Sequence, residues 1–179
     1  MNSKKNFFEL IKKSNEARLG KINTIHGFID TPAFMPVGTQ GTVKSIFVDD
    51  ILNTGAQIIL GNTYHLFLRP GTDILRKFGG LQKFMNWNKP ILTDSGGFQV
   101  MSLSKFNKID EKKGAIFSSH IDGKKFILSP EKSIQIQKII NSDILMVLDV
   151  CPKLTKNKKN KSEAIKVSTN WAKRCKDEF

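Results

Sequence analysis

Two acidic side chains in this sequence stand directly after short apolar runs. The run Ile91-Leu92-Thr93 ends at Asp94, and the run from Ile144 to Leu148 ends at Asp149. Nearly continuous apolar runs of this length are typical of strands buried in a parallel sheet, whose carboxyl ends face one side, where ligands bind. We therefore expect Asp94 and Asp149 to lie on one rim.

The residues that follow Asp94 could bind a planar polar ligand. They are Ser95, Gly96, Gly97 and Phe98. Glycines let a ligand approach the backbone closely, and an aromatic ring offers a flat apolar face beside hydrogen-bonding groups, a combination that suits a nucleobase. The same run is also compatible with a plain turn between a strand and a helix, in which Asp94 or Ser95 caps the helix.

A pair of carboxylates on one rim allows three kinds of chemistry. The pair could act as the acid and base that cleave a glycosidic bond. It could bind a hard metal ion, although no third carboxylate or histidine falls at a matching strand end. Alternatively, one carboxylate could do the chemistry while the other accepts hydrogen bonds from adjacent N–H donors on a base edge, such as that of guanine. The basic composition and Phe98 favour this third interpretation, and a purely structural role as two helix caps stays open.

The charge of the chain favours a polyanionic partner. Twenty-nine Lys and Arg stand against sixteen Asp and Glu, which gives a formal net charge of +13. An excess of this size is typical of proteins that bind nucleic acid. The excess consists mainly of lysine, however, and the chain is also rich in Asn and Ile, so a generally solvated basic surface encoded by an AT-rich genome explains part of it.

The expected compartment is the cytoplasm. The longest apolar runs are far too short to span a membrane, and the N-terminal residues lack the apolar stretch and the cleavage site of a secretory signal. Cys151 and Cys175 are too far apart to form a CxxC motif, so neither a disulfide framework nor a zinc knuckle is indicated.

The chain around the two aspartates is predicted to have an α/β fold. Residues 1–30 read as a small antiparallel β segment, in which His26 beside the turn glycine Gly27 is interpreted as structural. In residues 31–179, four strand–helix alternations predict a parallel sheet, and four such units are half of an eightfold barrel. Strands are predicted at 34–37, 56–60, 91–93 and 144–149, and helices from Val48 to a stop at Gly55, at 72–78 and from Ser129 onward.

The stretch from about 101 to 128 interrupts this alternation. Lysines surround two short apolar runs there, and Asp122-Gly123 between the runs is a strong turn signal. The pattern predicts a basic β-hairpin inserted after the third strand, at the rim. Asn62 and His65 follow an earlier strand, and we expect them to approach the same rim.

A set of longer motifs is spread along the whole chain in a fixed order: Thr31–Thr39, Gly55–Leu66, Leu68–Gly71, Leu92–Val100, Pro130–Ser133, Ile144–Asp149 and Trp171–Arg174. Together they resemble the bacterial type of tRNA-guanine transglycosylase, also called queuine tRNA-ribosyltransferase. The resemblance implies a TIM (β/α)8 barrel, of which this chain is the N-terminal half. It also implies the exchange of guanine at the anticodon wobble position of tRNA for preQ1 in queuosine biosynthesis, through a covalent ribosyl-enzyme.

The resemblance implies two roles for the rim residues, proton transfer and base recognition. Asp94 takes the place of the proton acceptor, and Asp149 takes that of the residue that reads the guanine edge. Val150 stands where the family usually has glutamate, which changes the polarity beside Asp149. The substrate-binding positions are Asp94, Ser95, Gly96, Gly97, Phe98 (stacked on the base), Asp149 and Cys151.

The resemblance assigns no residue of this chain to the family's nucleophilic aspartate or to its structural zinc site of three cysteines and one histidine. The chain is therefore interpreted as a truncated N-terminal half without metal ligands of its own, and the implied homodimer belongs to the full-length family. The alternative is an incomplete, inactive half-barrel that at most binds base or tRNA weakly. A glycoside hydrolase is the other enzyme class that the carboxylate pair leaves open.

Overall fold

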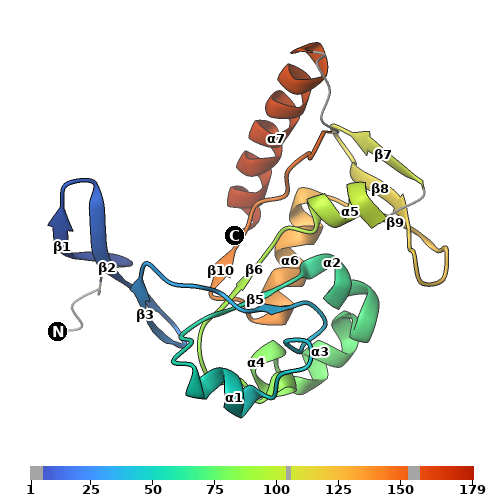
Figure 1. Ribbon diagram of the computed structural model, residues 1–179. Helices are drawn as coiled ribbons and strands as arrows, with labels where there is room; N and C mark the ends of the chain where they lie inside the picture. The colour runs from blue at the N-terminus through green and yellow to red at the C-terminus, as the bar shows by residue number, and fades with distance from the viewer. Residues whose placement is uncertain (1–5, 104–105, 153–157) are drawn as a thin grey trace.

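The computed structural model describes residues 6–103, 106–152 and 158–179, and it has a mixed α/β architecture (Figure 1). At its centre four parallel strands pair in the order β10-β6-β5-β4, so neighbours in the sheet follow one another along the chain apart from the inserted strands. The predicted parallel sheet is thus confirmed, as an open sheet in the described residues. The strands are β4 (Val37–Gly38), β5 (Ile59–Gly61), β6 (Ile91–Thr93) and β10 (Ile144–Leu145).

The fourth strand is shorter than its sequence predicts. The apolar run 144–149 is interpreted as one strand, but only Ile144 and Leu145 pair with β6. Beyond them Met146 and Val147 are exposed, and after the hydrogen bond from Met146 N to Thr93 O the described backbone runs on without pairing to a strand. The apolar pattern therefore overstates the strand, because part of the run faces outward.

Helices connect the strands where the sequence predicts them. The helix at 72–78 has the predicted bounds, and the helix predicted from Val48 begins there and ends at Asn53, just before the predicted stop at Gly55. The helix expected from Ser129 begins at Pro130, with the Ser129 Oγ accepting a 3.1 Å hydrogen bond from the backbone N–H of Lys132. None of the described helices is long and apolar enough to cross a lipid bilayer. The helical segments are α1 (Val48–Asn53), α2 (Thr63–Leu66), η1 (Phe67–Gly71), α3 (Thr72–Phe78), α4 (Leu81–Met85), α5 (Gly97–Leu103), α6 (Pro130–Ile140) and α7 (Lys158–Glu178).

The stretch predicted as a single hairpin forms a three-stranded antiparallel sheet instead. Its order is β7-β8-β9, and α5 occupies the first residues of the predicted insertion. The extra strand arises because the Asp110 carboxylate accepts hydrogen bonds from the backbone N–H groups of Lys112 and Lys113, which closes a second turn. The strands are β7 (Asn107–Asp110), β8 (Gly114–Ser118) and β9 (Lys125–Leu128).

A second antiparallel sheet precedes the parallel one, and its β1–β2 ribbon projects away from the rest of the molecule (Figure 1). His26, in the turn between β2 and β3, connects it to the parallel sheet. The backbone N–H of His26 donates to Asp143 Oδ1 at 3.1 Å, and its Nδ1 lies 2.9 Å from both carboxylate oxygens. The strands are β1 (Phe8–Ser14), β2 (Ala17–Thr24) and β3 (Gly27–Thr31).

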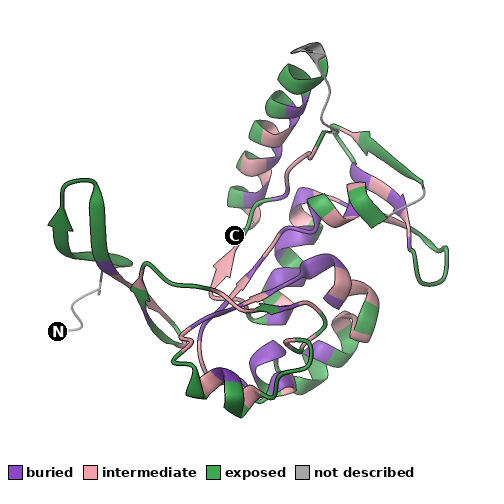
Figure 2. Ribbon diagram, in the orientation of Figure 1, coloured by how far each residue is buried: buried purple, intermediate pink, exposed green. Residues whose placement is uncertain are grey.

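The hydrophobic core lies between the parallel sheet, α6 and α7. Trp87, Tyr64, Phe117 and Trp171 are its largest fully buried side chains. Figure 2 shows buried residues concentrated on the central strands and α6, whereas the β1–β2 ribbon is mostly exposed. The core therefore fixes the parallel sheet and the insertion against each other.

An ion pair joins the two long helices on the outside of this core. Arg174 of α7 donates from Nε and Nη2 to the two carboxylate oxygens of Glu131 in α6, at 2.6 and 2.9 Å. This hydrogen-bonded contact lowers the pKa of Glu131 to about 2. The carboxylate is thus ionised across the physiological range and holds α7 in place.

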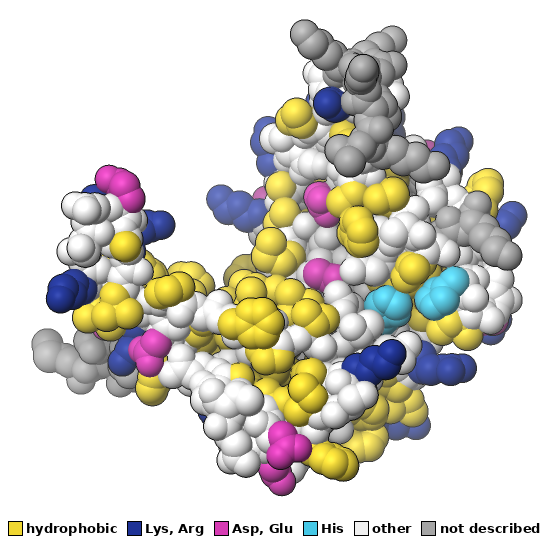
Figure 3. Space-filling model, viewed as in Figure 1, with side chains coloured by type: hydrophobic (Ala, Val, Ile, Leu, Met, Phe, Trp, Pro, Cys, Tyr) yellow, Lys and Arg dark blue, Asp and Glu magenta, His cyan; other side chains and the backbone are white. Residues whose placement is uncertain are grey.

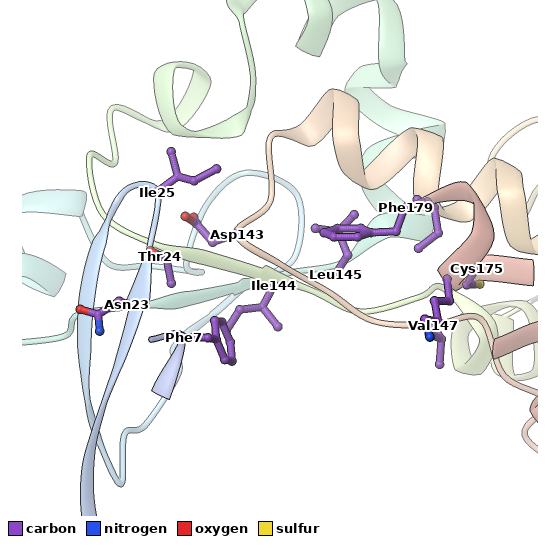
Figure 4. Close-up of a pocket in the computed structure, with 12 residues that line it drawn as sticks. Phe7, Asn23, Thr24, Ile25, Asp143, Ile144, Leu145, Val147, Cys175 and Phe179 are labelled. Carbon is purple, nitrogen blue, oxygen red and sulfur yellow. The ribbon is translucent and has the colours of Figure 1, made fainter. Parts of the chain in front are cut away.

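An open, mainly apolar groove of about 650 Å³ lies beside β10 (Figure 4). Ile25 of the β2–β3 turn, Ile144 of β10 and Phe179 at the end of the chain are among its lining residues. Neither Asp94 nor Asp149 contributes to it, so it is separate from the predicted rim.

Candidate functional site

Asp94 follows β6 directly, and three donors hold its carboxylate. Its Oδ2 accepts hydrogen bonds from Asn62 Nδ2 at 2.5 Å and Gln99 Nε2 at 2.9 Å, and its Oδ1 accepts one from the backbone N–H of Thr63 at 2.8 Å. The backbone N–H of Asp94 donates to Gly61 O at 3.1 Å, which extends the pairing of β6 with β5. The strand ends thus present a half-buried, oriented carboxylate with spare acceptor capacity on Oδ1.

Asp149 lies on the same rim, as predicted, and Ser95 connects it to the Asp94 strand end. Ser95 Oγ donates to Asp149 Oδ1 at 3.2 Å, and Cys151 Sγ donates to Oδ2 at 3.3 Å. A carboxylate oxygen can accept more than one hydrogen bond, so both oxygens keep capacity for a ligand. Because Ser95 directly follows Asp94 and contacts Asp149, the two carboxylates lie on one rim.

The Cys151 thiol stays protonated at neutral pH. Burial raises its pKa to about 11, and the charge of Asp149 and the hydrogen bond to it act in the same direction. Cys151 therefore serves here as a hydrogen-bond donor to the carboxylate and not as a thiolate nucleophile.

Glycine is required at positions 96 and 97 of the rim for two different structural reasons. Gly96 has a φ of +86°, a left-handed conformation that side chains disfavour. At Gly97 a Cβ would lie 2.5 Å from the backbone carbonyl oxygen of Asp149, so only glycine permits this contact. The close approach brings the start of α5 directly against the segment that carries Asp149.

A cavity of about 190 Å³ opens beside this contact. Gly97, Asp149 and Cys151 line it together with residues of α5, β7 and β8. Phe98 lies on the first turn of α5, 57% exposed, and is not among the lining residues. Phe98 therefore follows a cavity-lining residue, Gly97, in the sequence, and its ring is exposed to solvent.

Two histidines border the rim, and one of them comes from the insertion. His120, between β8 and β9, stacks on Tyr64 with ring centroids 5.6 Å apart, and its Nδ1 lies 3.0 Å from the Tyr64 hydroxyl. The ring centroids of His65 and His120 are 5.9 Å apart, and Figure 3 shows two histidine side chains side by side on this face. Burial lowers the pKa of His65, and His120 lowers it further, whereas Asp94 raises it.

Sequence reasoning placed Asn62 and His65 near the rim but missed three contributors. Thr63 acts through its backbone N–H, which has no side-chain signature. Gln99 belongs to the same run as Asp94, and helical spacing from the strand end could have indicated its contact. His120 required the insertion to fold back on α2, which no local pattern reveals.

The described residues contain no group of three or more His, Cys, Asp or Glu side chains that could hold a metal ion. These residues thus offer no ligand set for the zinc ion that the resemblance implies.

A sequence model of the family described as queuine tRNA-ribosyltransferase matches residues 13–179. The chain belongs to that family. Among its curated relatives, the queuine tRNA-ribosyltransferase of Fusobacterium nucleatum is 54% identical over 168 residues, which cover 94% of this chain and 45% of the relative. That of a Psychrobacter strain is 56% identical over 164 residues, with 92% and 43% covered.

The match is confined to part of each relative. The chain spans a little less than half the length of these queuine tRNA-ribosyltransferases. Within this chain the similarity to the family extends over nearly all of its residues.

Proposed function

We propose that this chain supplies the base-recognition and proton-transfer part of a tRNA-guanine transglycosylase, which exchanges guanine at the anticodon wobble position of tRNA for preQ1. The observation that carries the proposal is the shared rim: Ser95 connects the strand end bearing Asp94 to Asp149, beside a cavity. The names of the relatives support tRNA as the substrate. The net charge of +13, with basic side chains spread over the visible face (Figure 3), suits a polyanion.

Base recognition falls to Asp149. Guanine presents two adjacent donors, N1–H and the exocyclic amine, and a carboxylate can accept both. Ser95 and Cys151 orient this carboxylate without saturating it. The target nucleotide must leave its stack to reach the cavity, and the exposed ring of Phe98 is available to stack on the base.

Proton transfer falls to Asp94. In the proposed reaction a carboxylate nucleophile attacks the anomeric carbon of the ribose, guanine leaves, and a covalent ribosyl-enzyme forms. The incoming base then attacks through a ring nitrogen that must lose its proton, and Asp94 accepts it. No residue described here is assigned as the nucleophile.

We also propose that residues 31–179 form the first four units of a (β/α)8 barrel, with residues 1–30 as a preceding β segment. Four parallel strands in sequence order support this arrangement. The apolar groove beside β10 lies where a continuing strand would pack. The cytoplasmic location, the zinc site and the homodimer belong to the same proposal for a full-length family member.

The groove and the free side of β10 also favour a second outcome for the chain by itself: a half-barrel that binds base weakly and does not turn over. Purified chain should therefore fail to incorporate labelled guanine into tRNA. Robust incorporation would contradict the assignment of the nucleophile to residues outside this chain.

The decisive experiment is a guanine titration by calorimetry. The chain should bind guanine, and Asp149→Asn should lose most of this binding, because an amide presents a donor to one of guanine's donors. Asp122→Asn, an exposed aspartate in the β8–β9 turn, is the matched control and should bind normally. Equal binding by all three proteins, or none by the wild type, would contradict the proposal.

A further inference from the structure

The segment that carries Asp149 is held in an unusual way. Pairing with β6 ends at Leu145, and the last ladder contact is the hydrogen bond from the backbone N–H of Met146 to Thr93 O, at 3.1 Å. Asp149 lies three residues further on. Its position therefore depends on whatever holds the backbone between Met146 and Val150.

Side chains of the two neighbouring helices take the place of a strand partner there. They bind alternate backbone N–H groups, which is the spacing at which a strand presents donors to one neighbour. Two belong to α7 and one to α6. The contacts are Met146 N to Gln137 Oε1 at 2.9 Å, Leu148 N to Cys175 Sγ at 3.4 Å, and Val150 N to Ser168 Oγ at 2.9 Å.

The amide of Gln137 uses its complete hydrogen-bonding capacity. Its Oε1 accepts from Met146 N and from Thr93 Oγ1, the latter at 2.8 Å, and its Nε2 donates to Met146 O at 2.9 Å and to Ser133 Oγ at 3.1 Å. The residue is fully buried. A flipped amide would set N–H against N–H at Met146, so the orientation is fixed.

The same network reaches Asp149 from the other side of the rim. Ser133 Oγ, which accepts from Gln137, donates to the backbone carbonyl of Ser95 at 2.9 Å. Ser95 Oγ in turn donates to Asp149 Oδ1. Gln137 thus contacts the backbone that leads to Asp149 directly, and it reaches Ser95, which holds the Asp149 carboxylate, through Ser133.

We propose that Gln137 is a positioning residue for Asp149, and that Ser168 fixes the far end of the same segment. The consequence for base recognition rests on the proposed function, whereas the placement of the segment stands on its own contacts.

The first test replaces Gln137 by methionine, which has a similar volume and none of the amide's hydrogen bonds. Amide hydrogen exchange at residues 146–150 should accelerate about tenfold or more, while α1 and α3 keep their protection. Guanine affinity should fall by a similar factor. Gln135→Met is the matched control on the exposed face of α6, and it should change neither quantity.

The second test replaces Ser168 by alanine, a smaller change that keeps the protein folded if Gln137→Met does not. Exchange should accelerate at Val150 and its neighbours, and the matched control Thr169→Ala, one residue further along α7, should not show this. Acceleration that is uniform along the chain, or no larger than in the controls, would overturn the positioning role. If the wild type binds no guanine yet the exchange effects are local, base recognition fails and the positioning of the segment survives.

Discussion

The two ends of the parallel sheet each carry a hydrogen-bonded aspartate, and they differ in what surrounds it. The side chain of Asp143, at the amino ends of β6 and β10, is fully buried. Its oxygens contact the backbone and ring of His26 and accept a hydrogen bond from the N–H of Ile91. Asp94, at the carboxyl ends, is also held by three donors, but it shares its rim with Asp149, which lines a cavity together with Gly97. Hydrogen bonding thus orients both carboxylates, whereas the carboxyl-end aspartate is distinguished by a second carboxylate, Asp149, on the same rim.

The largest effect is expected for Asp94→Asn, which tests whether the carboxyl-end aspartate takes part in the chemistry. The variant is made in a full-length chimera of this chain with the remaining residues of the Fusobacterium nucleatum relative. Turnover should fall by about 10²–10⁴-fold, because an amide cannot accept the proton. The measurement is incorporation of labelled guanine into tRNA, with thermal unfolding as the check that the fold persists. Unchanged turnover would refute the role of Asp94.

Asp143→Ala should act on stability instead. Loss of the carboxylate leaves the Ile91 N–H and the His26 donors without their partner, at a cost of about 3 kcal/mol of unfolding free energy. Urea unfolding of the chain measures this cost. Asp73→Ala, at an exposed ion pair with Arg76, is the control and should change stability by less than about 0.5 kcal/mol. A similar small effect at both positions would remove the distinction between the two ends.

Phe98→Ala should weaken guanine binding about tenfold, through lost stacking, and leave the unfolding midpoint nearly unchanged because the ring is exposed. Phe34→Ala, at another exposed ring away from the rim, is the matched control. Calorimetric titration of both variants decides whether exposure at the carboxyl-end rim has a binding role. Equal affinities would show that it does not.

The Glu131–Arg174 pair tests a third carboxylate, which is hydrogen-bonded and does not line the cavity. Its folded-state pKa of about 2 lies below the ordinary 4.5, so its stabilisation is complete above about pH 4.5 and is lost as the pH falls toward 2. Since both side chains are about one-third exposed, Glu131→Gln should cost about 1 kcal/mol at pH 7. Thermal unfolding between pH 7 and 2 should show the variant and wild type converging at the acid end, and a constant difference would contradict the assignment.

Local sequence signals predicted much of the fold. The start of α1 followed from its acidic first turn, the end of α3 from the glycines that stop it, and the start of α6 from Ser129 and Pro130. The parallel sheet followed from the apolar runs. These features depend on residues close in sequence, which is why a pattern of a few residues suffices.

The rest depended on contacts between distant segments. The end of β10 is set by side chains of α6 and α7, so the apolar run 144–149 alone overstates the strand. The insertion gained a strand because of a turn closed by Asp110. At the rim, the ends of the apolar runs selected Asp94 and Asp149, but a backbone donor such as the N–H of Thr63 becomes evident only when the chain is folded.

The contact at Gly97 constrains how this rim can change through evolution. A single added methyl group at position 97 would clash with the backbone of Asp149. The start of α5 and the Asp149 segment are therefore packed against each other without space for a side chain. A substitution that moved the Asp149 segment would therefore displace α5, and a substitution that moved the start of α5 would displace the Asp149 segment. Variation in ligand preference is therefore expected to arise from residues that reach into the cavity from farther away, while position 97 stays glycine.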